Sequence, residues 1–347
     1  MVTHDIIVIG GSAGSIEALR AIVGALPADL AASVLVVVHQ PAYAESRLPA
    51  VLDRAGPLSV GRAENGQRLE AGRIYVGRPD FHLLLSAVDM QIRLSKGPKE
   101  NRSRPAIDPL FRSAAVYHGP RVIGVLLSGL LDDGTAGLWA IKDQGGMAIV
   151  QEPSDAQWPD MPRSALENIP HLDYALPAGE IGPLLGRLSA EAAAARAQSV
   201  PAIMNAEAAM TALDARQVRQ EDRPGEPSRY ACPDCHGALF EIREGPILRY
   251  RCRTGHGYTF ASLEEELRVQ ADAALWNALR SLGEYAALLS RSAEQAQASG
   301  NAQAASAKRT LKDAAQARVE ALREVIEADP DDRTLERFAD PEQGPSA

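Results

Sequence analysis

The chain is poor in cysteine, in net positive charge and in long apolar segments, and each shortage excludes a class of protein. Its three cysteines all lie between positions 232 and 252, which argues against a disulfide framework and favours a metal site. The formal net charge of −9 argues against a general nucleic-acid binder. No aliphatic run approaches the roughly 20 residues that span a bilayer. An acidic residue and a strand follow the first methionine almost at once, unlike a signal peptide, so we expect a cytoplasmic protein without membrane insertion.

The first half of the chain has the pattern of an α/β domain. Aliphatic runs alternate with helix-forming segments over residues 1–190, which predicts a doubly wound, mostly parallel sheet in a three-layer, Rossmann-like arrangement. The predicted strands are Ile6–Ile9, Ser33–Val38, Arg73–Val76, His82–Leu85, Arg121–Leu127 and Met147–Val150, with Asp89–Leu94 as a hairpin partner of the fourth. The predicted helices are one after Ser15 and those over Glu45–Arg54, Leu110–Tyr117 and Gly134–Asp143.

Composition divides the remainder into four segments. Residues 191–228 are rich in Ala and Gln and then in charged residues and Pro, which indicates a linker with room for one helix. Residues 229–261 form a Cys-, Gly- and aromatic-rich module. Residues 262–330 favour helix almost throughout, with a break at Gly300-Asn301, and predict a long α-helical hairpin or coiled-coil arm. Residues 331–347 are predicted to be disordered. The apolar stripe of the arm comprises Leu263, Leu267, Leu275, Leu279, Leu282, Leu288 and Leu289.

The turn after the first strand carries the most informative motif. The run Gly10-Gly11-Ser12-Ala13-Gly14-Ser15 lies between a buried strand and a helix. A dinucleotide-binding fingerprint requires glycine where this run has Ser12 and Ser15. The G-x-S-x-G pattern of a nucleophile elbow fits instead, with Ser12 at the apex. A turn or helix-capping role for Ser12 is the structural alternative.

A serine nucleophile needs a base and a group that orients the base, and two other strand ends supply them. His39 ends the second predicted strand, and the adjacent carboxylates Asp132 and Asp133 follow the strand that ends at Leu127. Parallel strands place their carboxyl ends at one edge of a sheet, so these side chains can meet Ser12. The backbone N–H groups after Ser12 and in the 129–131 loop are candidates for an oxyanion hole. Taken singly, each side chain also fits a structural role in a loop or cap.

The cysteine-rich module has the spacing of a zinc ribbon. Cys232 and Cys235 form a C-x2-C pair, and Cys252 with His256 forms a C-x3-H pair, separated by strand-like residues. Four such ligands complete a tetrahedron and leave no open position, so the zinc is expected to be structural. A redox C-x-x-C pair is the alternative. His236 is the less suitable ligand, because its position next to Cys235 points it away from a closed knuckle.

Several segments, in this order, resemble the catalytic domain of the CheB-type chemotaxis protein-glutamate methylesterases. They are Ile9–Ser15, Val38–Pro41, Ile107–Ser113, Leu127–Gly137, and the stretch from Gly146-Met147 to Met161-Pro162-Arg163. The resemblance covers residues 1 to about 190. It implies Ser12 as nucleophile, His39 as base and Asp133, the carboxylate directly before Gly134, as the orienting group. It further implies an oxyanion hole from the backbone amides near Ala13 and Leu130.

The implied reaction is hydrolysis of glutamyl γ-methyl esters on the cytoplasmic helices of methylated chemoreceptor-type proteins, with release of methanol. Deamidation of glutamine is a second activity of the same chemistry. Arg163 is a candidate contact for substrate carboxylates. His82, Asp108 and Arg112 fit structural roles, the last two in capping and in pairing on a helix surface.

Two departures from the family pattern affect the prediction. Family members often carry an N-terminal receiver domain, whereas this chain begins at the catalytic strand, so we expect that mode of control to be absent. Leu131 stands where the family usually has a glycine, which alters the loop beside Leu130. Similar ribbon-plus-helix tails occur behind relatives without a receiver, where docking to a partner and self-association are both open. The competing hypothesis for the whole chain is a scaffold or regulator that binds chemoreceptor-like helices without catalysis.

Overall fold

The computed structural model describes residues 2–43, 46–86, 90–196, 199–213 and 225–328. The chain forms two compact units, Met1–Glu264 and Glu265–Ala347. The predicted disordered tail, residues 197–198 and 214–224 of the predicted linker, Glu45 and Asp89 lie outside the described residues. Within the described part of the chain, no helix combines the length and the apolar character that crossing a membrane requires.

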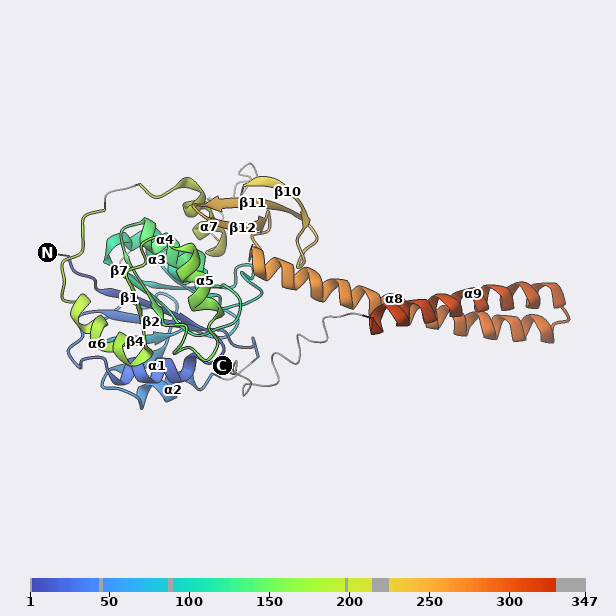
Figure 1. Ribbon diagram of the computed structural model, residues 1–347, viewed down its shortest axis with the longest axis horizontal. Helices are drawn as coiled ribbons and strands as arrows, with labels where there is room; N and C mark the ends of the chain where they lie inside the picture. The colour runs from blue at the N-terminus through green and yellow to red at the C-terminus, as the bar shows by residue number, and fades with distance from the viewer. Residues whose placement is uncertain (1, 44–45, 87–89, 197–198, 214–224, 329–347) are drawn as a thin grey trace, which may run out of the picture. The chain divides into compact units, whose positions relative to one another are not determined.

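The centre of the first unit is a parallel sheet of seven strands, which confirms the predicted α/β class (Figure 1). Its order is β3-β4-β2-β1-β7-β8-β9, and every neighbouring pair is parallel. The strand bounds are β1 Ile6–Gly11, β2 Ser33–Val38, β3 Ser59–Arg62, β4 Arg73–Val76, β7 Val122–Leu126, β8 Met147–Gln151 and β9 Tyr174–Leu176. Runs of β-branched residues form the central strands because these strands are buried on both faces.

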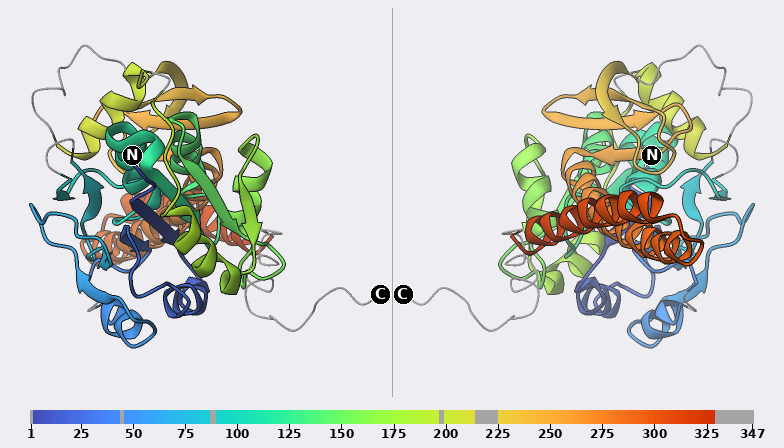
Figure 2. Two further views of the ribbon diagram at one scale, coloured as in Figure 1. Left: turned by 90° about the vertical axis from the view of Figure 1, so that its left-hand side faces the viewer. Right: turned by 90° about the vertical axis from the view of Figure 1, so that its right-hand side faces the viewer.

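Helices cover both faces of this sheet and create two cores (Figure 2). Alternate residues of β1 point to opposite sides: Ile6 and Val8 belong to one core, and Ile7 and Ile9 to the other. The helices α1 Ser15–Gly24, α2 Leu48–Asp53 and α6 Ala178–Leu188 supply apolar residues to the second core, and α3 Ile107–His118, α4 Thr135–Asp143 and α5 Asp160–Asn168 supply the first. A 3-10 turn, Gly119–Arg121, joins α3 to β7.

The predicted hairpin forms, but apart from the main sheet. Strand β5 (His82–Leu85) pairs with β6 (Ile92–Ser95) in an antiparallel sheet of two strands. Strands β3 and β9 were not predicted. β3 is short and carries exposed residues, and β9 has only three residues, so neither shows the continuous apolar run of a buried strand.

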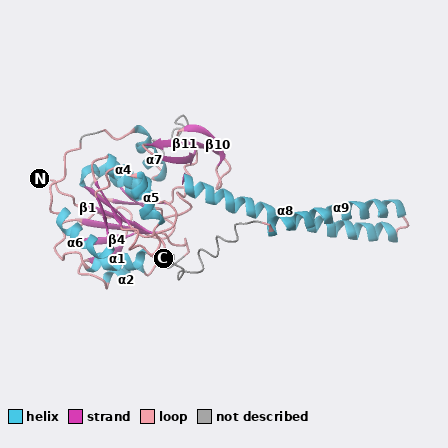
Figure 3. Ribbon diagram, viewed as in Figure 1, coloured by secondary structure: helices cyan, strands magenta, loops and turns pink. Residues whose placement is uncertain are grey.

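The cysteine-rich module is an antiparallel sheet, β10-β11-β12-β13, that belongs to the same compact unit as the parallel-sheet domain (Figure 3). Its strands are β10 Glu226–Ala231, β11 Ala238–Glu244, β12 Ile247–Cys252 and β13 Gly257–Thr259. Residues 191–228, where we expected a linker with room for one helix, contain α7 (Ala202–Thr211). Met204 and Ala208 of this helix are buried in the first core, so the helix packs against the parallel-sheet domain and does not form part of a free linker.

A buried cluster of charged side chains joins the module to the parallel-sheet domain. Arg251 of β12 contacts Glu100 at 2.7 Å and Glu207 of α7 at 2.9 Å. Arg112 of α3 reaches Glu100 at 2.6 Å, and Arg249 of β12 reaches Glu207 at 2.7 Å. Each of these side chains is at most 6% exposed. We call the set the arginine–glutamate cluster; it comprises Glu100, Arg112, Glu207, Glu244, Arg249 and Arg251.

The described residues of the second unit belong almost entirely to two helices. Helix α8 runs over Phe260–Ala298, so its first residues belong to the first unit, and α9 runs over Ala302–Glu327. The break falls where the sequence predicts it, with Gly300 in the left-handed region at φ 78° and Asn301 capping α9 through Ala304 N. Leu289 is buried, but Leu288, which we placed in the same apolar stripe, is 64% exposed. A 3.6-residue period puts these neighbours about 100° apart, and only Leu289 lies on the buried side of the helix.

Candidate active site

Three neighbouring strands bring the predicted site residues to one edge of the sheet. Ser12 follows β1, and His39 follows β2, its parallel neighbour, with Gly11 opposite Val38. On the other side of β1, β7 leads into the loop that carries Asp133. The carboxyl ends of parallel strands open onto a common crevice, and this sheet places its polar residues there.

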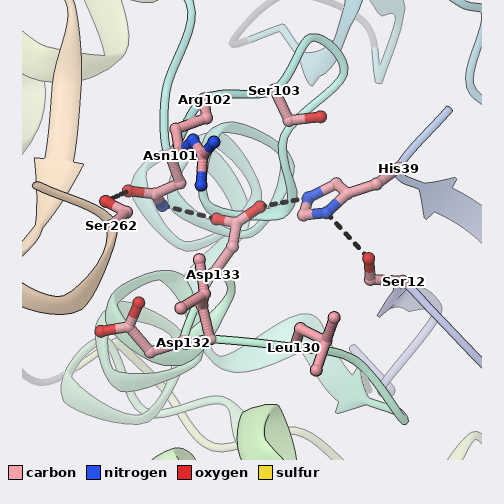
Figure 4. A pocket seen from close by; sticks show the side chains of 10 residues that line it. Ser12, His39, Asn101, Arg102, Ser103, Leu130, Asp132, Asp133 and Ser262 are labelled. Carbon is pink, nitrogen blue, oxygen red and sulfur yellow. Dashed lines mark hydrogen bonds and ion pairs between the residues drawn. The ribbon is translucent and has the colours of Figure 1, made fainter. Parts of the chain in front are cut away.

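The three side chains form one hydrogen-bonded chain (Figure 4). Nδ1 of His39 lies 3.1 Å from Oγ of Ser12, and Nε2 of His39 lies 2.7 Å from Oδ2 of Asp133. An ionised carboxylate only accepts hydrogen bonds, so Nε2 carries the proton and Nδ1 accepts from the serine hydroxyl. This tautomer is the one in which His39 can take the proton of Ser12.

Asp133 is held as a carboxylate although its side chain is only 3% exposed. Burial by itself raises the pKa of Asp133, but hydrogen bonds from His39, the backbone N–H of Ile107 and the side chain of Asn101 outweigh it and lower the pKa overall. These donors lie at 2.7 Å. The adjacent Asp108 has the opposite shift: burial, together with the charge of Asp133, raises its pKa well above the ordinary value. The pKa values of the two neighbouring carboxyl groups are therefore shifted in opposite directions.

Two glycines let the loops approach closely enough for this arrangement. Gly14 has φ 71°, which turns the chain from Ser12 into α1. A Cβ at Gly129 would lie 2.0 Å from Sδ of Met161 and 2.8 Å from Cβ of Ser12. The β7 loop can therefore lie against the serine turn only with glycine at this position, and Ser12 N–H bonds to Ser128 O at 2.9 Å across the same approach.

The predicted oxyanion donors are available for a ligand. Among the described residues, no protein acceptor pairs with the backbone N–H of Ala13 or of Leu130. Leu131 has φ 61°, the left-handed conformation in which glycine is favoured. At the position that departs from the family pattern, a leucine therefore adopts a backbone conformation that glycine adopts more easily.

A cavity of about 300 Å³ opens at the serine hydroxyl. Asp132 lines the cavity beside Asp133. Burial raises the pKa of Asp132 to about 6, although the hydrogen bond from Thr259 acts to lower this pKa. The lining residues are Ser12, His39, Asn101, Arg102, Ser103, Leu130, Leu131, Asp132, Asp133 and Ser262.

Other predicted residues lie away from the cavity. Arg163, on α5, is 55% exposed and 3.9 Å from Asp160, so its contact with substrate stays a prediction. His82 is fully buried, with Nε2 at 2.9 Å from Pro98 O, in agreement with a structural role. Asp108 caps α4 by accepting from Gly134 N and Gly137 N. The expectation that Arg112 pairs on a helix surface is wrong, because Arg112 is 2% exposed and ion-paired with Glu100.

Sequence reasoning missed the residues that complete the cavity from outside the three strand ends. Asn101 donates to Asp133, while Thr259 and Ser262 come from the end of the cysteine-rich module and the start of α8. Asn101 lies in an irregular loop with φ 48°, a conformation that asparagine tolerates. Because the loop is neither helix nor strand, its sequence has no periodic pattern that would have pointed to Asn101. The contact spans more than 150 positions in sequence, so no local pattern could reveal it.

The cysteine-rich module brings the four predicted metal ligands together. The Sγ atoms of Cys232, Cys235 and Cys252 and a ring nitrogen of His256 all lie within 4.8 Å of one another. Cys235 and Cys252 are 3.7 Å apart at sulfur, and Cys252 Sγ is 3.5 Å from Nδ1 of His256. Zn–S bonds of about 2.3 Å and Zn–N bonds of about 2.0 Å in a tetrahedron require edges of roughly 3.7 and 3.5 Å. The donor set thus fits zinc, and His236 lies outside it.

Comparison with known proteins agrees with this geometry. The sequence profile of the CheB methylesterase family matches residues 7–185, more than half of the 347 residues. The chain belongs to the CheB methylesterase family. The crystal structure of the Thermotoga maritima CheB methylesterase catalytic domain is similar at a TM-score of 0.51 and 35% identity, covering 53% of this chain and 98% of that one.

Curated members of the CheB methylesterase family give the same picture. A Nocardioides protein named protein-glutamate methylesterase/protein-glutamine glutaminase is 37% identical over 189 residues, 54% of this chain and 51% of its own length. A Leptospira interrogans protein that provisionally carries the same two activities in its name is 37% identical over 185 residues, 53% of this chain and 95% of its own. The matched region therefore fills nearly all of some relatives and about half of others, and in this chain it stops before the cysteine-rich module.

Proposed function

We propose that this chain is a serine hydrolase that demethylates glutamyl γ-methyl esters on methylated chemoreceptor-type helical proteins, releases methanol and acts in the cytoplasm. The observation that carries the proposal is the hydrogen-bonded chain from Ser12 through His39 to Asp133 at the mouth of an open cavity. Membership of the CheB methylesterase family supports the substrate class.

The proposed reaction proceeds in two stages. Ser12 Oγ attacks the ester carbonyl carbon while Nδ1 of His39 takes the hydroxyl proton. Asp133 holds the imidazolium that forms, and the free N–H groups of Ala13 and Leu130 stabilise the oxyanion of the tetrahedral intermediate. Collapse of the intermediate breaks the bond to the methoxy group, and His39 gives its proton to the leaving methanol. A water molecule, deprotonated by His39, then hydrolyses the acyl-enzyme to the glutamate carboxylate and free Ser12.

The same acyl-enzyme can form from a glutamine side chain, with ammonia as the leaving group in place of methanol. The names of the curated relatives, which join methylesterase to glutaminase, favour this second activity. An ammonia assay on a receptor helix with glutamine at the methylation positions tests it separately from the esterase reaction.

Methanol release from a methylated receptor fragment tests the esterase proposal. We expect the wild-type chain to release methanol and Ser12→Ala to lose the activity by at least about 10³-fold. Ser33→Ala is the matched control, because Ser33 begins β2 at the opposite edge of the sheet and its hydroxyl bonds to Glu70 O. Equal rates for wild type and Ser12→Ala would refute the nucleophile. A wild-type chain that binds the receptor fragment and releases no methanol would favour the scaffold hypothesis.

We further propose that the group Cys232, Cys235, Cys252 and His256 holds a structural zinc ion. All four positions of the tetrahedron are taken by protein ligands, so the ion has no open position for substrate. Metal analysis of the purified chain should give about one zinc per chain, and Cys232→Ser should lose it. His236→Ala, which alters the adjacent histidine outside the group, should keep it. Zinc retained in full by Cys232→Ser would refute the site.

The two-helix tail supports either docking to a partner or self-association, and the sequence left both open. Sedimentation velocity of the full chain distinguishes them. A dimer that becomes monomeric when residues 265–347 are removed would favour self-association, and a monomer in both cases would favour docking to another protein.

A further inference from the structure

The side chain of Asn101 links Asp133 to the end of the cysteine-rich module and the start of α8. Its Nδ2 lies 2.7 Å from Oδ1 of Asp133 and 2.9 Å from Oδ2 of Asp108. Its Oδ1 accepts from Thr259 N at 2.9 Å and from Ser262 Oγ at 3.2 Å. Asn101 therefore joins Asp133 and Asp108 on one side to Thr259 and Ser262 on the other, and Figure 4 shows its bonds to Asp133 and to Ser262.

The module decides which way the Asn101 amide points. An amide presents two N–H donors at one end and an acceptor oxygen at the other. If the amide were reversed, its oxygen would face the carboxyl oxygens of Asp133 and Asp108, and its N–H groups would face the backbone N–H of Thr259, which can only donate; the Ser262 hydroxyl could accept in either case. The donors of the module thus select the orientation in which Asn101 donates to Asp133.

The donors of the module are themselves fixed. Thr259 and Ser262 bond reciprocally at the start of α8: Ser262 N donates to Thr259 Oγ1 at 3.1 Å, and the Thr259 N–H is shared between Asn101 Oδ1 and Ser262 Oγ, each at 2.9 Å. This is the geometry of a helix capping box. The Thr259 hydroxyl also donates to Asp132 Oδ1 at 2.5 Å, so the same turn of chain contacts both adjacent aspartates of the β7 loop, one directly and one through Asn101.

The backbone of the Asn101 loop is held by the module as well. Asn101 N donates to Gly257 O at 2.8 Å, and Gly257 N donates to Lys99 O at 3.2 Å. Gly257 directly follows His256, a member of the metal-ligand group. On the far side of the loop, Glu100 is paired with Arg251 of β12 in the arginine–glutamate cluster. The loop therefore has bonds to the module at successive residues.

We propose that Asn101 is a positioning residue for Asp133, held in place by Thr259 and Ser262. Through this contact, the cysteine-rich module contributes to the geometry of the catalytic centre. This rests on the proposed function in that Asp133 orients the base of Ser12. Loss of the contacts with the module should lower the rate at which Ser12 reacts. It should leave the affinity for substrate unchanged, because that affinity depends on other residues.

The test uses the rate at which a small alkylphosphonate probe labels Ser12, followed by intact-protein mass. This readout does not depend on the identity of the natural substrate. If wild type labels and releases no methanol, the proposed substrate fails while the proposal on Asn101 is still tested. In the full-length chain, Asn101→Gly removes the side chain and tolerates φ 48°, and Asn101→Asp keeps the shape and replaces the donor by a charged acceptor.

We expect Asn101→Gly to slow labelling by about 10- to 100-fold, the range for a hydrogen bond to a charged group, and Asn101→Asp to slow it more. Ser262→Ala removes one of the two bonds to Oδ1 and should slow labelling about threefold to tenfold. With receptor ester as substrate, the loss should appear in kcat with little change in KM. Ser228→Ala, on exposed β10 of the same module, is the matched control and should label at the wild-type rate.

A double-mutant cycle separates positioning from general loss of structure. If Ser262 acts through Asn101, Ser262→Ala has no further effect in the Asn101→Gly background. Thermal unfolding of each variant measures how much of the loss comes from the fold. Wild-type labelling rates for both Asn101→Gly and Asn101→Asp would overturn the proposal. So would independent, multiplicative effects of Ser262→Ala and Asn101→Gly.

Discussion

The Glu207→Gln variant tests whether the arginine–glutamate cluster fastens the cysteine-rich module to the parallel-sheet domain. Glu207 is 0% exposed, and its carboxylate lies 2.7 Å from Arg249 and 2.9 Å from Arg251. Burial alone would raise the pKa of Glu207, but the charges of Arg249, Arg251 and Arg112 lower it from the ordinary 4.5 to about 2. The difference corresponds to about 3 kcal/mol of stabilisation of the ionised form.

Replacing this carboxylate by an amide leaves buried arginines without their full counter-charge. Removal of one partner from a buried ion pair costs about 3–5 kcal/mol. We therefore expect the free energy of unfolding of the first unit to fall by about 3 kcal/mol or more at pH 7. Denaturant unfolding followed by tryptophan fluorescence measures this. Glu17→Gln is the matched control, since the Glu17 side chain is 78% exposed in its pair with Arg20 and such surface pairs contribute about 0–1 kcal/mol.

The pH dependence supplies a second measure of the same effect. The pKa of Glu207 is depressed in the folded state, so its contribution is present above the unfolded value of 4.5 and is lost as the pH falls toward about 2. The difference in stability between wild type and Glu207→Gln should shrink over this interval. A Glu207→Gln chain within 1 kcal/mol of wild type at pH 7, or a difference that does not change between pH 5 and pH 3, would refute the reasoning.

Three further variants test the site. Asp133→Asn places an amide among four donors, including Nε2 of His39. The variant should lower kcat about 10⁴-fold in the methanol assay, because His39 loses the tautomer that can take the proton of Ser12. A loss under tenfold contradicts the assignment. Leu131→Gly should leave the free energy of unfolding nearly unchanged in thermal unfolding. Glycine removes the strain of a leucine in the left-handed conformation, about 1–2 kcal/mol, and this offsets the entropy that its more flexible backbone loses on folding, about 0.5–1 kcal/mol. A fall in stability of more than about 1 kcal/mol contradicts this. For Asp132, whose pKa is raised to about 6, the protonated form is the one that stabilises the fold, so the stability of wild type relative to Asp132→Asn should decline as the pH rises from about 4 through 6. A difference between the two chains that stays constant over this interval argues against it.

The residues at the strand ends could be predicted from the sequence because their signals are local. A buried strand followed by a small-residue turn identifies Ser12, and the same pattern of strand and loop identifies His39 and the two carboxylates after β7. The choice of Asp133 over Asp132 came only from the family resemblance. In the structure, Asp133 bonds to His39, while Asp132 bonds to Thr259.

The attachment of the cysteine-rich module could not be predicted in the same way. Charged side chains such as Arg112 and Glu207 fit solvated helix faces when they are seen one helix at a time. Their burial depends on partners more than 90 positions away or in another element, as in the pair of Arg251 with Glu100. Residues 191–228 therefore resembled a linker, because the partners of α7 were not visible in its own sequence.

Peptide mapping of the chain after reaction with an alkylphosphonate ester is the most direct measurement of the central claim, that Ser12 is a nucleophile activated by His39. We predict a single stoichiometric adduct on the peptide that contains Ser12, its absence in Ser12→Ala, and labelling slower by at least about 10³-fold in His39→Ala. An adduct on another serine, or labelling of Ser12 at the wild-type rate in His39→Ala, would contradict the account.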